Sequence, residues 1–345
     1  MISLLQEGEV KFYAPTGEKI SSKLPVFYNP QMKLARDVAV EIVRQLKPKN
    51  ACCLMDASGI RSLRLWKEAG VENITANDIS DAACELMEKN FSLNKAKIKI
   101  AKGDCNSLET EEGFDYIDLD PFGSPVKFLS SAVSKLKRNG VIAITATDIG
   151  CMAGRFKEAC MRKYFIKPLV SPFSKELATR ILISKVQSAA AEYEKALIPI
   201  FVQYSNHYIR VYLKCHGTIS DVLASQGFVF FCKSCMRWKT SKIPVASSCK
   251  CGADLDWAGP MWIGMLWDSR LKVNSIKHVN DEALISALGF YDTHKMSKRL
   301  KFAIPRIEPL MEKIRSAGFK ASRTHFCDTA VRSDIPYEKF MKLIS

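Results

Sequence analysis

The stretch that decides the fold runs from residue 51 to residue 61 and reads ACCLMDASGIR. Its first five residues, Ala51 to Met55, are apolar and predict a short buried strand. The strand closes on Asp56-Ala57-Ser58-Gly59, and a helix is predicted from Ile60 to about Ala69, with Gly70 as its C-terminal stop. A strand, a tight loop and a helix in this order form the first unit of an α/β sheet.

The same alternation continues on both sides of this unit. Apolar residues at helical spacing predict a helix over residues 33–46 on the N-terminal side. On the C-terminal side the pattern predicts strands at 73–76, 98–101, 116–119 and 141–145, helices at 80–90, 126–136 and 176–194, and a final strand pair at 198–204 and 208–214. We therefore predict a mostly parallel, doubly wound sheet that ends in an antiparallel hairpin.

This order of elements resembles the Rossmann-like fold of S-adenosylmethionine-dependent methyltransferases. The loop after the first strand has no GxGxxG, which a dinucleotide pyrophosphate would require, so a nicotinamide dehydrogenase fits less well. Ligands of such sheets bind beyond the carboxyl ends of the strands. Acidic residues stand at four successive predicted strand ends, where helix capping is the alternative to ligand binding: Asp56, Asp78, Asp104 and Asp120.

Composition limits the class of protein. The 345 residues predict roughly two domains. We expect an intracellular, cytoplasmic protein, because no apolar run approaches the ~20 residues of a membrane span and the N-terminus does not resemble a signal peptide. The formal charge is +15, and residues 216–345 hold 20 basic and 12 acidic side chains, against 31 and 24 in residues 1–215. Such an excess indicates either a polyanionic partner such as nucleic acid or a soluble basic surface. Nothing in the sequence indicates an obligate protein partner.

Two groups stand out among the twelve cysteines. Six of them, such as Cys52 and Cys105, have apolar or small neighbours and are expected to be buried reduced thiols. Four others form two close pairs within residues 232–251, and four thiolates so spaced suit a closed, structural zinc site, with four reduced thiols as the alternative. The second pair is CxC where CxxC is usual; the four are Cys232, Cys235, Cys249 and Cys251.

The motif after the fourth predicted strand, Asp120-Pro121-Phe122-Gly123, is similar to the Asp/Asn-Pro-Pro-aromatic motif of enzymes that methylate exocyclic amino groups of bases. Such an amino nitrogen is a poor nucleophile because its lone pair is delocalised into the ring. A carboxylate and a rigidly held proline carbonyl can accept its N–H bonds, and the aromatic ring can stack on the base. The alternative is a plain turn, which Asp-Pro-x-Gly also favours.

Several further sequence motifs occur in the same chain. They are residues 26–30 (VFYNP), 36–37 (RD), 120–125 (DPFGSP), 145–148 (TATD), 206–210 (NHYIR) and 321–326 (ASRTHF). Over residues 7–335 the chain resembles the tRNA (guanine-26-N2)-dimethyltransferase family. The resemblance implies transfer of two methyl groups from S-adenosylmethionine to N2 of guanine-26 in tRNA.

The resemblance also implies roles for single residues. Arg36, Arg61, Asp78, Asp104 and Cys105 match cofactor-binding positions. Asp78 suits the ribose hydroxyls, Asp104 the adenine amino group and the Cys105 N–H a ring nitrogen, while the two arginines orient the methionine carboxylate or hold acidic neighbours. The strand-end Asp56 is expected to face the same cleft. The residues expected at the reacting base are Asp120, Pro121, Phe122 and Phe27.

The domain prediction follows from these assignments. Residues 1–215 are expected to form the methyltransferase domain, and residues 216–345 a smaller mixed α+β domain that carries the zinc loop and binds tRNA. Basic side chains at 295–301 and Arg323 are expected to grip the tRNA, with a solvated basic face as the alternative. His207 and His325 are expected to be structural. Two other functions stay open: an N2-guanine methyltransferase for another tRNA or rRNA position, and a non-catalytic, zinc-stabilised tRNA-binding protein.

Overall fold

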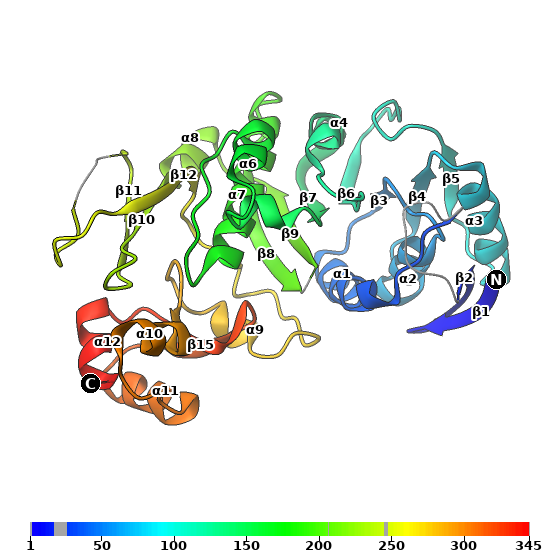
Figure 1. Ribbon diagram of the computed structural model, residues 1–345. Coiled ribbons are helices and arrows are strands. Elements are labelled where there is room, and N and C mark those ends of the chain that lie inside the picture. Colours follow the sequence, from blue (N-terminus) through cyan, green and yellow to red (C-terminus); the bar gives the residue numbers. More distant parts are fainter. Residues whose placement is uncertain (1, 17–25, 206, 245–247, 345) are drawn as a thin grey trace.

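The computed structural model describes residues 2–16, 26–205, 207–244 and 248–344. The chain begins with a hairpin of the antiparallel strands β1 (Ile2–Glu7) and β2 (Val10–Pro15). Figure 1 shows this hairpin and the C-terminal helices at opposite sides of the molecule, with the large sheet between them. Asn206, which belongs to the predicted hairpin turn, lies outside the described residues.

The central sheet has the predicted topology. Within the described residues it contains seven strands, in the spatial order β5-β4-β3-β6-β7-β9-β8. The first five pair in parallel, and β9 pairs antiparallel with both β7 and β8, so the terminal hairpin is confirmed. The strands are β3 (Asn50–Cys53), β4 (Asn73–Asp78), β5 (Lys99–Lys102), β6 (Phe114–Leu119), β7 (Leu136–Ala146), β8 (Leu197–Ser205) and β9 (Tyr208–Cys215).

The strand order places a ligand crevice at a defined position. The first strand of the sheet, β3, lies between β4 and β6, so the chain winds outward from it in both directions. In open α/β sheets, the carboxyl ends of the strands at such a reversal form the binding crevice. The loops after β3, β4 and β6 therefore meet at one edge.

Helices connect the strands and cover the sheet. Helix α1 packs against α2, α3 packs on β4 and β5, and α7 packs on β8 and β9. Local signals set their ends: the Ser80 side chain accepts a hydrogen bond from the Ala83 N–H, and Gly70 adopts φ 73° after α2. The helices are η1 (Pro30–Met32), α1 (Lys33–Leu46), α2 (Ile60–Ala69), α3 (Asp81–Leu93), η2 (Val126–Phe128), α4 (Leu129–Ser134), α5 (Ile149–Met152), α6 (Lys157–Tyr164) and α7 (Ser174–Ala191).

Two predicted helices extend beyond the observed ones. The helix expected over 176–194 ends at Ala191, and the helix expected over 126–136 is also shorter. Residues 126–136 form the short helices η2 and α4, and the chain already enters β7 at Leu136. Leu136 pairs with Phe114 at the start of β6, and the register of the two strands then shifts before Tyr116 pairs with Val141. Pairing with a distant strand, which helical spacing does not report, therefore decides where this helix ends.

The C-terminal part holds two small antiparallel sheets. Their strand orders are β11-β10-β12 and β13-β15-β14. The strands are β10 (Gln226–Phe231), β11 (Trp238–Ser241), β12 (Asp256–Trp262), β13 (Tyr291–Asp292), β14 (Ala321–Thr324) and β15 (Cys327–Ser333). The helices are α8 (Ile219–Ala224), α9 (Val279–Glu282), α10 (Thr293–Leu300), α11 (Ile307–Ser316) and α12 (Tyr337–Ile344), and Figure 1 shows the last three grouped around β15.

A buried ion-pair cluster joins the two parts of the chain. Arg332 on β15 bonds through Nη2 to Glu176 on α7 at 2.5 Å and through Nε to Glu282 on α9 at 2.8 Å. Arg180 donates to the same Glu176 at 2.8 Å. All four side chains are almost completely buried. One continuous cluster of buried apolar side chains also runs from the central sheet into the C-terminal part. The two parts therefore share a core.

No helix among the described residues is both long and apolar enough to cross a membrane.

Glu176→Gln tests how strongly this cluster stabilises the fold. The change leaves Arg332 and Arg180 with less negative charge in a buried site, so we expect the free energy of unfolding to fall by about 3 kcal/mol. Urea denaturation followed by circular dichroism measures it. Asp81→Asn is the control, because it breaks an exposed pair with Lys102 and should change stability by less than about 1 kcal/mol. Equal effects of the two substitutions would contradict the assignment.

Candidate active site and metal centre

A cavity of about 540 Å³ lies beyond the carboxyl ends of the central strands. The elements around it are the loops after β3, β4, β5 and β6, the start of α2 and the segment before α1. Every residue that the sequence predicted for cofactor or base lines this one cavity: Phe27, Arg36, Asp56, Arg61, Asp78, Asp104, Cys105, Asp120, Pro121 and Phe122. Folding therefore brings together residues that are up to 95 positions apart in the sequence.

A larger hollow, of about 1260 Å³, lies at the other edge of the sheet. The first residues of the strands line it, among them Asn50, Asn73 and Phe114. It contains none of the strand-end acids and none of the Asp-Pro-Phe motif. Because the chemistry-bearing residues all face the smaller cavity, we assign the site there despite its smaller volume.

The loop after β3 is held by the acid at the end of β4. Asp78 accepts hydrogen bonds from the Ala57 N–H at 2.9 Å and the Ser80 N–H at 3.0 Å. Gly59 then begins α2 in a left-handed conformation, φ 76°, and a Cβ there would lie 2.6 Å from the Phe91 ring. Glycine is therefore required at position 59 of this loop. The neighbouring Ser58 does not disturb the conformation of Gly59.

Asp56 is the most perturbed acid of the cavity. Its side chain is buried, and its Oδ2 has no hydrogen-bond partner among the described residues. Burial raises the pKa of Asp56 to about 7. A carboxylate that is buried without a partner destabilises the folded protein. A cationic group of a bound ligand would offset this cost.

The loop after β5 presents one exposed acid and one buried thiol. Asp104 is exposed and accepts a hydrogen bond from the Asn106 N–H at 2.9 Å. Cys105 is buried, and burial raises the pKa of its thiol to about 11. The thiol therefore stays protonated at neutral pH, and a role for Cys105 falls to its backbone.

Asp120 follows β6 and is held by Arg61 from the start of α2. Arg61 Nη2 donates to one oxygen of Asp120, Oδ2, and within the described part of the chain no other side chain bonds to this carboxylate. Asp120 is 19% exposed on its side chain, so the other oxygen can meet a ligand. Arg61 Nη1 is buried and has no hydrogen-bond partner among the described residues.

The Asp-Pro-Phe-Gly turn is fastened to the end of β7. Gly123 and Thr147 exchange two hydrogen bonds, from the Gly123 N–H to Thr147 Oγ1 at 2.8 Å and from the Thr147 N–H to the Gly123 carbonyl at 2.9 Å. Gly123 adopts φ 73°, which favours glycine. Phe122 is about half exposed, and its ring meets Phe27 edge-on with centroids 4.5 Å apart. The two rings form an aromatic wall next to Asp120.

Arg36 lines the cavity but its guanidinium is paired. It donates through Nε and Nη2 to the two oxygens of Glu7, at 2.7 and 2.6 Å, and Arg64 bonds to the same Glu7 at 2.9 Å. These arginine contacts hold the pKa of Glu7 below its usual range although burial alone would raise it. The two arginines were expected either to orient the methionine carboxylate or to hold acidic neighbours. Both Arg36 and Arg61 hold acidic neighbours. Arg61 also has an N–H group, on Nη1, without a partner among the described residues.

Three charged residues of this region were missed by the sequence reasoning. Glu7 precedes β2 and carries no motif. Asp118 lies within the apolar run of β6, and Arg210 within β9, and both are buried. Asp118 bonds to Arg210 and lies 3.3 Å from Arg61 Nε. For Asp118 and Arg210, the available signal was a charged residue inside an otherwise apolar predicted strand.

The two histidines differ in position. His325 makes the hydrogen bonds expected of a structural residue: Nδ1 lies 2.7 Å from Glu282 Oε2, and Nε2 accepts from the Tyr204 N–H at 3.2 Å. His207, in contrast, lines the cavity, and its Nε2 is buried without a partner among the described residues. The location of His207 was not predicted.

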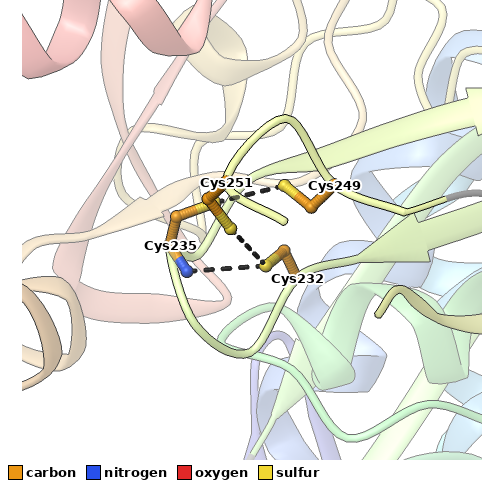
Figure 2. Close-up of side chains that lie close together, drawn as sticks. All are labelled: Cys232, Cys235, Cys249 and Cys251. Carbon is orange, nitrogen blue, oxygen red and sulfur yellow. Dashed lines mark hydrogen bonds between the residues drawn. The ribbon is translucent and has the colours of Figure 1, made fainter. Parts of the chain in front are cut away.

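The cysteine cluster is brought together as expected (Figure 2). All four sulfur atoms lie within 4.8 Å of one another, with 3.6 Å between Cys232 and Cys251 and 3.4 Å between Cys235 and Cys249. Sulfur atoms bound tetrahedrally at about 2.3 Å from zinc are about 3.8 Å apart, so the arrangement fits a metal. The separations are far beyond the ~2.05 Å of a disulfide. The CxC pair therefore reaches the same centre as the CxxC pair.

The remaining cysteines are free as well. The six that the sequence placed among apolar neighbours are all buried: Cys52, Cys53, Cys84, Cys105, Cys151 and Cys160. Their expected state as buried thiols is confirmed.

Comparison with known proteins finds one consistent relationship. The model of the N2,N2-dimethylguanosine tRNA methyltransferase family matches residues 8–345. A tRNA (guanine(26)-N(2))-dimethyltransferase of Methanosphaera stadtmanae is 35% identical, over 99% of this chain and 96% of the relative. A tRNA (guanine(26)-N(2)/guanine(27)-N(2))-dimethyltransferase of Aquifex aeolicus is 34% identical, over 99% and 95%.

A solved structure agrees with these relatives. The complex of Trm1 from Pyrococcus horikoshii with S-adenosyl-L-methionine superposes with a TM-score of 0.88, at 31% identity, over 99% of this chain and all of that chain. The family model, the full-length relatives and the superposition all extend over both parts of the molecule. The chain belongs to the N2,N2-dimethylguanosine tRNA methyltransferase family.

Proposed function

We propose that this protein transfers two methyl groups from S-adenosylmethionine to the exocyclic N2 of guanine-26 in tRNA. The observation that carries the proposal is the position of Asp120 and Pro121 in the same cavity as the strand-end acids Asp56 and Asp78. A methyl donor and an amino-group acceptor site are thereby placed next to each other. Family membership along almost the whole chain supports the substrate.

The residues of the cavity fit the methyl donor. S-adenosylmethionine would supply the activated methyl group. Asp78 would bind the ribose hydroxyls and Asp104 the adenine amino group, while the Cys105 N–H would meet a ring nitrogen. The unpartnered atoms fit the charged amino acid end, because Asp56 Oδ2 suits an ammonium and Arg61 Nη1 suits a carboxylate.

At the base, Asp120 and Pro121 would accept the two N–H bonds of the guanine amino group. This raises electron density on nitrogen, and the carboxylate can take the proton that nitrogen loses. Phe27 and Phe122 would hold the base in line by ring contacts. The exposed position of Phe122 suits a site that must readmit a monomethylated base for a second transfer.

We further propose that residues 1–215 carry this chemistry and that residues 216–345 grip the tRNA. Helix α10 presents an exposed basic face made of Lys295, Lys298 and Arg299, with Lys301 just beyond it. Such side chains bind phosphates and release counterions. tRNA modification in a reducing cytoplasm also agrees with twelve cysteines of which none forms a disulfide among the described residues.

A second tRNA position is the alternative with a specific observation behind it. The Aquifex aeolicus relative is named for guanine-26 and guanine-27, at an identity close to that of the relatives named for guanine-26 alone. Mapping of the methylated positions in the product tRNA separates the two possibilities. A non-catalytic tRNA-binding protein is less favoured, since Asp120 and the strand-end acids all line the cavity.

We propose that the cysteine cluster holds one structural zinc ion. All four ligands come from the protein, so no position stays open for a substrate. The metal would tie the turn after β10 to the segment before β12, next to α12, where Tyr337 donates a hydrogen bond to the Cys235 carbonyl.

The activity is tested with an unmodified tRNA transcript and S-adenosylmethionine. Nucleoside mass spectrometry should find N2,N2-dimethylguanosine, and a transcript with adenine at position 26 should give none. Asp120→Ala should lower the turnover number by about 10³-fold, because it removes the acceptor of the amino group, with cofactor affinity by calorimetry unchanged. Glu112→Ala, an exposed acid at the other edge of the sheet, is the control. Turnover of Asp120→Ala near that of Glu112→Ala would exclude the assigned role.

Asp56→Asn tests the unpaired buried acid. The raised pKa, about 7, means that the folded protein holds a proton that the unfolded chain has already lost between about pH 4 and pH 7. Stability therefore falls as pH rises through this window. We expect Asp56→Asn to be more stable than the parent at pH 8, by roughly 3 to 4 kcal/mol, and closer to it at pH 4.5. Its affinity for S-adenosylmethionine should fall. Thermal unfolding at both pH values measures this, and a destabilised variant at pH 8 would contradict it.

The zinc site is tested by metal content. Protein purified under reducing conditions should contain about one zinc per chain by mass spectrometry of the metal. Cys232→Ser should lose it and unfold at a lower temperature, whereas Cys327→Ser, in the same part of the chain but outside the cluster, should keep it. Metal content near zero in the reduced parent protein would show four plain thiols.

A further inference from the structure

A buried polar stripe crosses the central sheet directly behind the cavity. It consists of Asp118 on β6, Thr145 on β7 and Arg210 on β9, and each of these side chains is at most 1% exposed. The strand register places them on one face of the sheet, because Asp118 pairs with Ala143, two residues before Thr145, and Thr145 pairs with Arg210. Buried central strands are usually continuous apolar runs, so a charged stripe at this position calls for a function.

Arg210 and Asp118 fix each other inside this stripe. Arg210 donates through Nε to Tyr212 at 2.8 Å, through Nη1 to Thr145 at 2.7 Å and through Nη2 to Asp118. Tyr116 donates a further hydrogen bond to Asp118 Oδ2 at 2.9 Å. Burial alone would raise the pKa of Asp118, but the two arginines hold it below its usual range, so Asp118 is ionised. One oxygen, Oδ2, takes these bonds, and Oδ1 faces Arg61.

Arg61 is shared between two carboxylates. Its Nε lies 3.3 Å from Asp118 Oδ1, while its Nη2 bonds to Asp120 Oδ2. Nε and Nη2 form one edge of a planar guanidinium, and both N–H groups of this edge can bind the two oxygens of a single carboxylate. In this structure Nε forms an ion pair with Asp118 Oδ1 without a hydrogen bond, and Asp120 receives one N–H, from Nη2.

We propose that Asp118 is a positioning residue, which holds Arg61 so that one oxygen of Asp120 stays free for the amino group of the substrate base. If Asp118 were uncharged, Arg61 would turn its Nε/Nη2 edge fully onto Asp120 and occupy both oxygens. The charges support the same conclusion. Two arginines, Arg61 and Arg210, lie beside two aspartates here. If Asp118 loses its charge, Asp120 is the remaining carboxylate for both arginines. The role of Asp118 rests on the proposed function of Asp120.

The test is the single-turnover rate of methyl transfer to a tRNA transcript. For Asp118→Asn we expect this rate to fall about 10- to 100-fold, as for a misplaced catalytic group. The affinity for S-adenosylmethionine and the KM for tRNA should change by less than about threefold, since Asp78 and Asp104 still bind the cofactor and the aromatic wall still holds the base. Loss of both affinities together with the rate would instead indicate general damage to the fold and would overturn the proposal.

A double variant makes the test specific. A lysine ammonium is a point charge and cannot bind both oxygens of a carboxylate through a planar edge. Because Arg61 is also proposed to bind the cofactor carboxylate, the rates are compared at saturating S-adenosylmethionine. Under this condition we expect Asp118→Asn with Arg61→Lys to be faster than Asp118→Asn alone, by about threefold or more. If the second substitution only lowers the rate further, Asp118 does not act through Arg61.

A milder pair of variants keeps the proposal testable if Asp118→Asn does not fold. Thr145→Val removes one acceptor of Arg210 and loosens the anchor of Asp118. Thr179→Val is the matched control, because Thr179 is equally buried and its hydroxyl donates to the Lys175 carbonyl of its own helix, with no other side-chain bond in the described part of the chain. Thr145→Val should be slower than Thr179→Val at equal cofactor affinity, and equal rates would overturn the proposal. If the parent protein itself does not methylate tRNA, the proposed function fails, not the role of Asp118.

Discussion

The contact between Arg61 and Asp120 joins the two loops on which the site depends. Arg61 stands at the start of α2, directly after the loop that follows β3, and Asp120 stands directly after β6. These strands are neighbours in the sheet, and the cavity opens where they end. A charged pair at this place requires that both loops be correctly folded at once. The two sides of the cavity are therefore built as one unit.

The second constraint is the arrangement of charge over the whole chain. The formal charge of +15 is not spread evenly, because acids gather at the strand ends and in buried pairs while lysines stay on the surface. The buried cluster of Glu176, Arg332 and Glu282 locks the C-terminal part onto α7. A basic surface such as that of α10 is thus held at a defined position relative to the cavity, which a large and rigid polyanionic substrate requires.

Much of the fold could be predicted because its signals are local. Apolar runs that end in Asp56, Asp78 or Asp120 indicated parallel strands, and the turn between residues 205 and 208 indicated the hairpin. The helix over 126–136 was overestimated, because its end is decided by the pairing of Leu136 with Phe114, and such a contact leaves no periodic trace. Similarly, the CxC spacing left the metal site open, and only the distances between sulfur atoms show that Cys249 and Cys251 reach one centre.

The sequence by itself determined the order of elements, the family and a set of candidate site residues that line one cavity, since each of these is written in motifs of consecutive residues. The tertiary structure decided which charges meet. Glu7 holds Arg36 across 29 positions, and Asp118 meets Arg210 across 92, and neither pair follows from any local pattern. The reason is physical: a buried charge is tolerated only beside its partner, and the partner is chosen by the packing of strands and helices far apart in the chain.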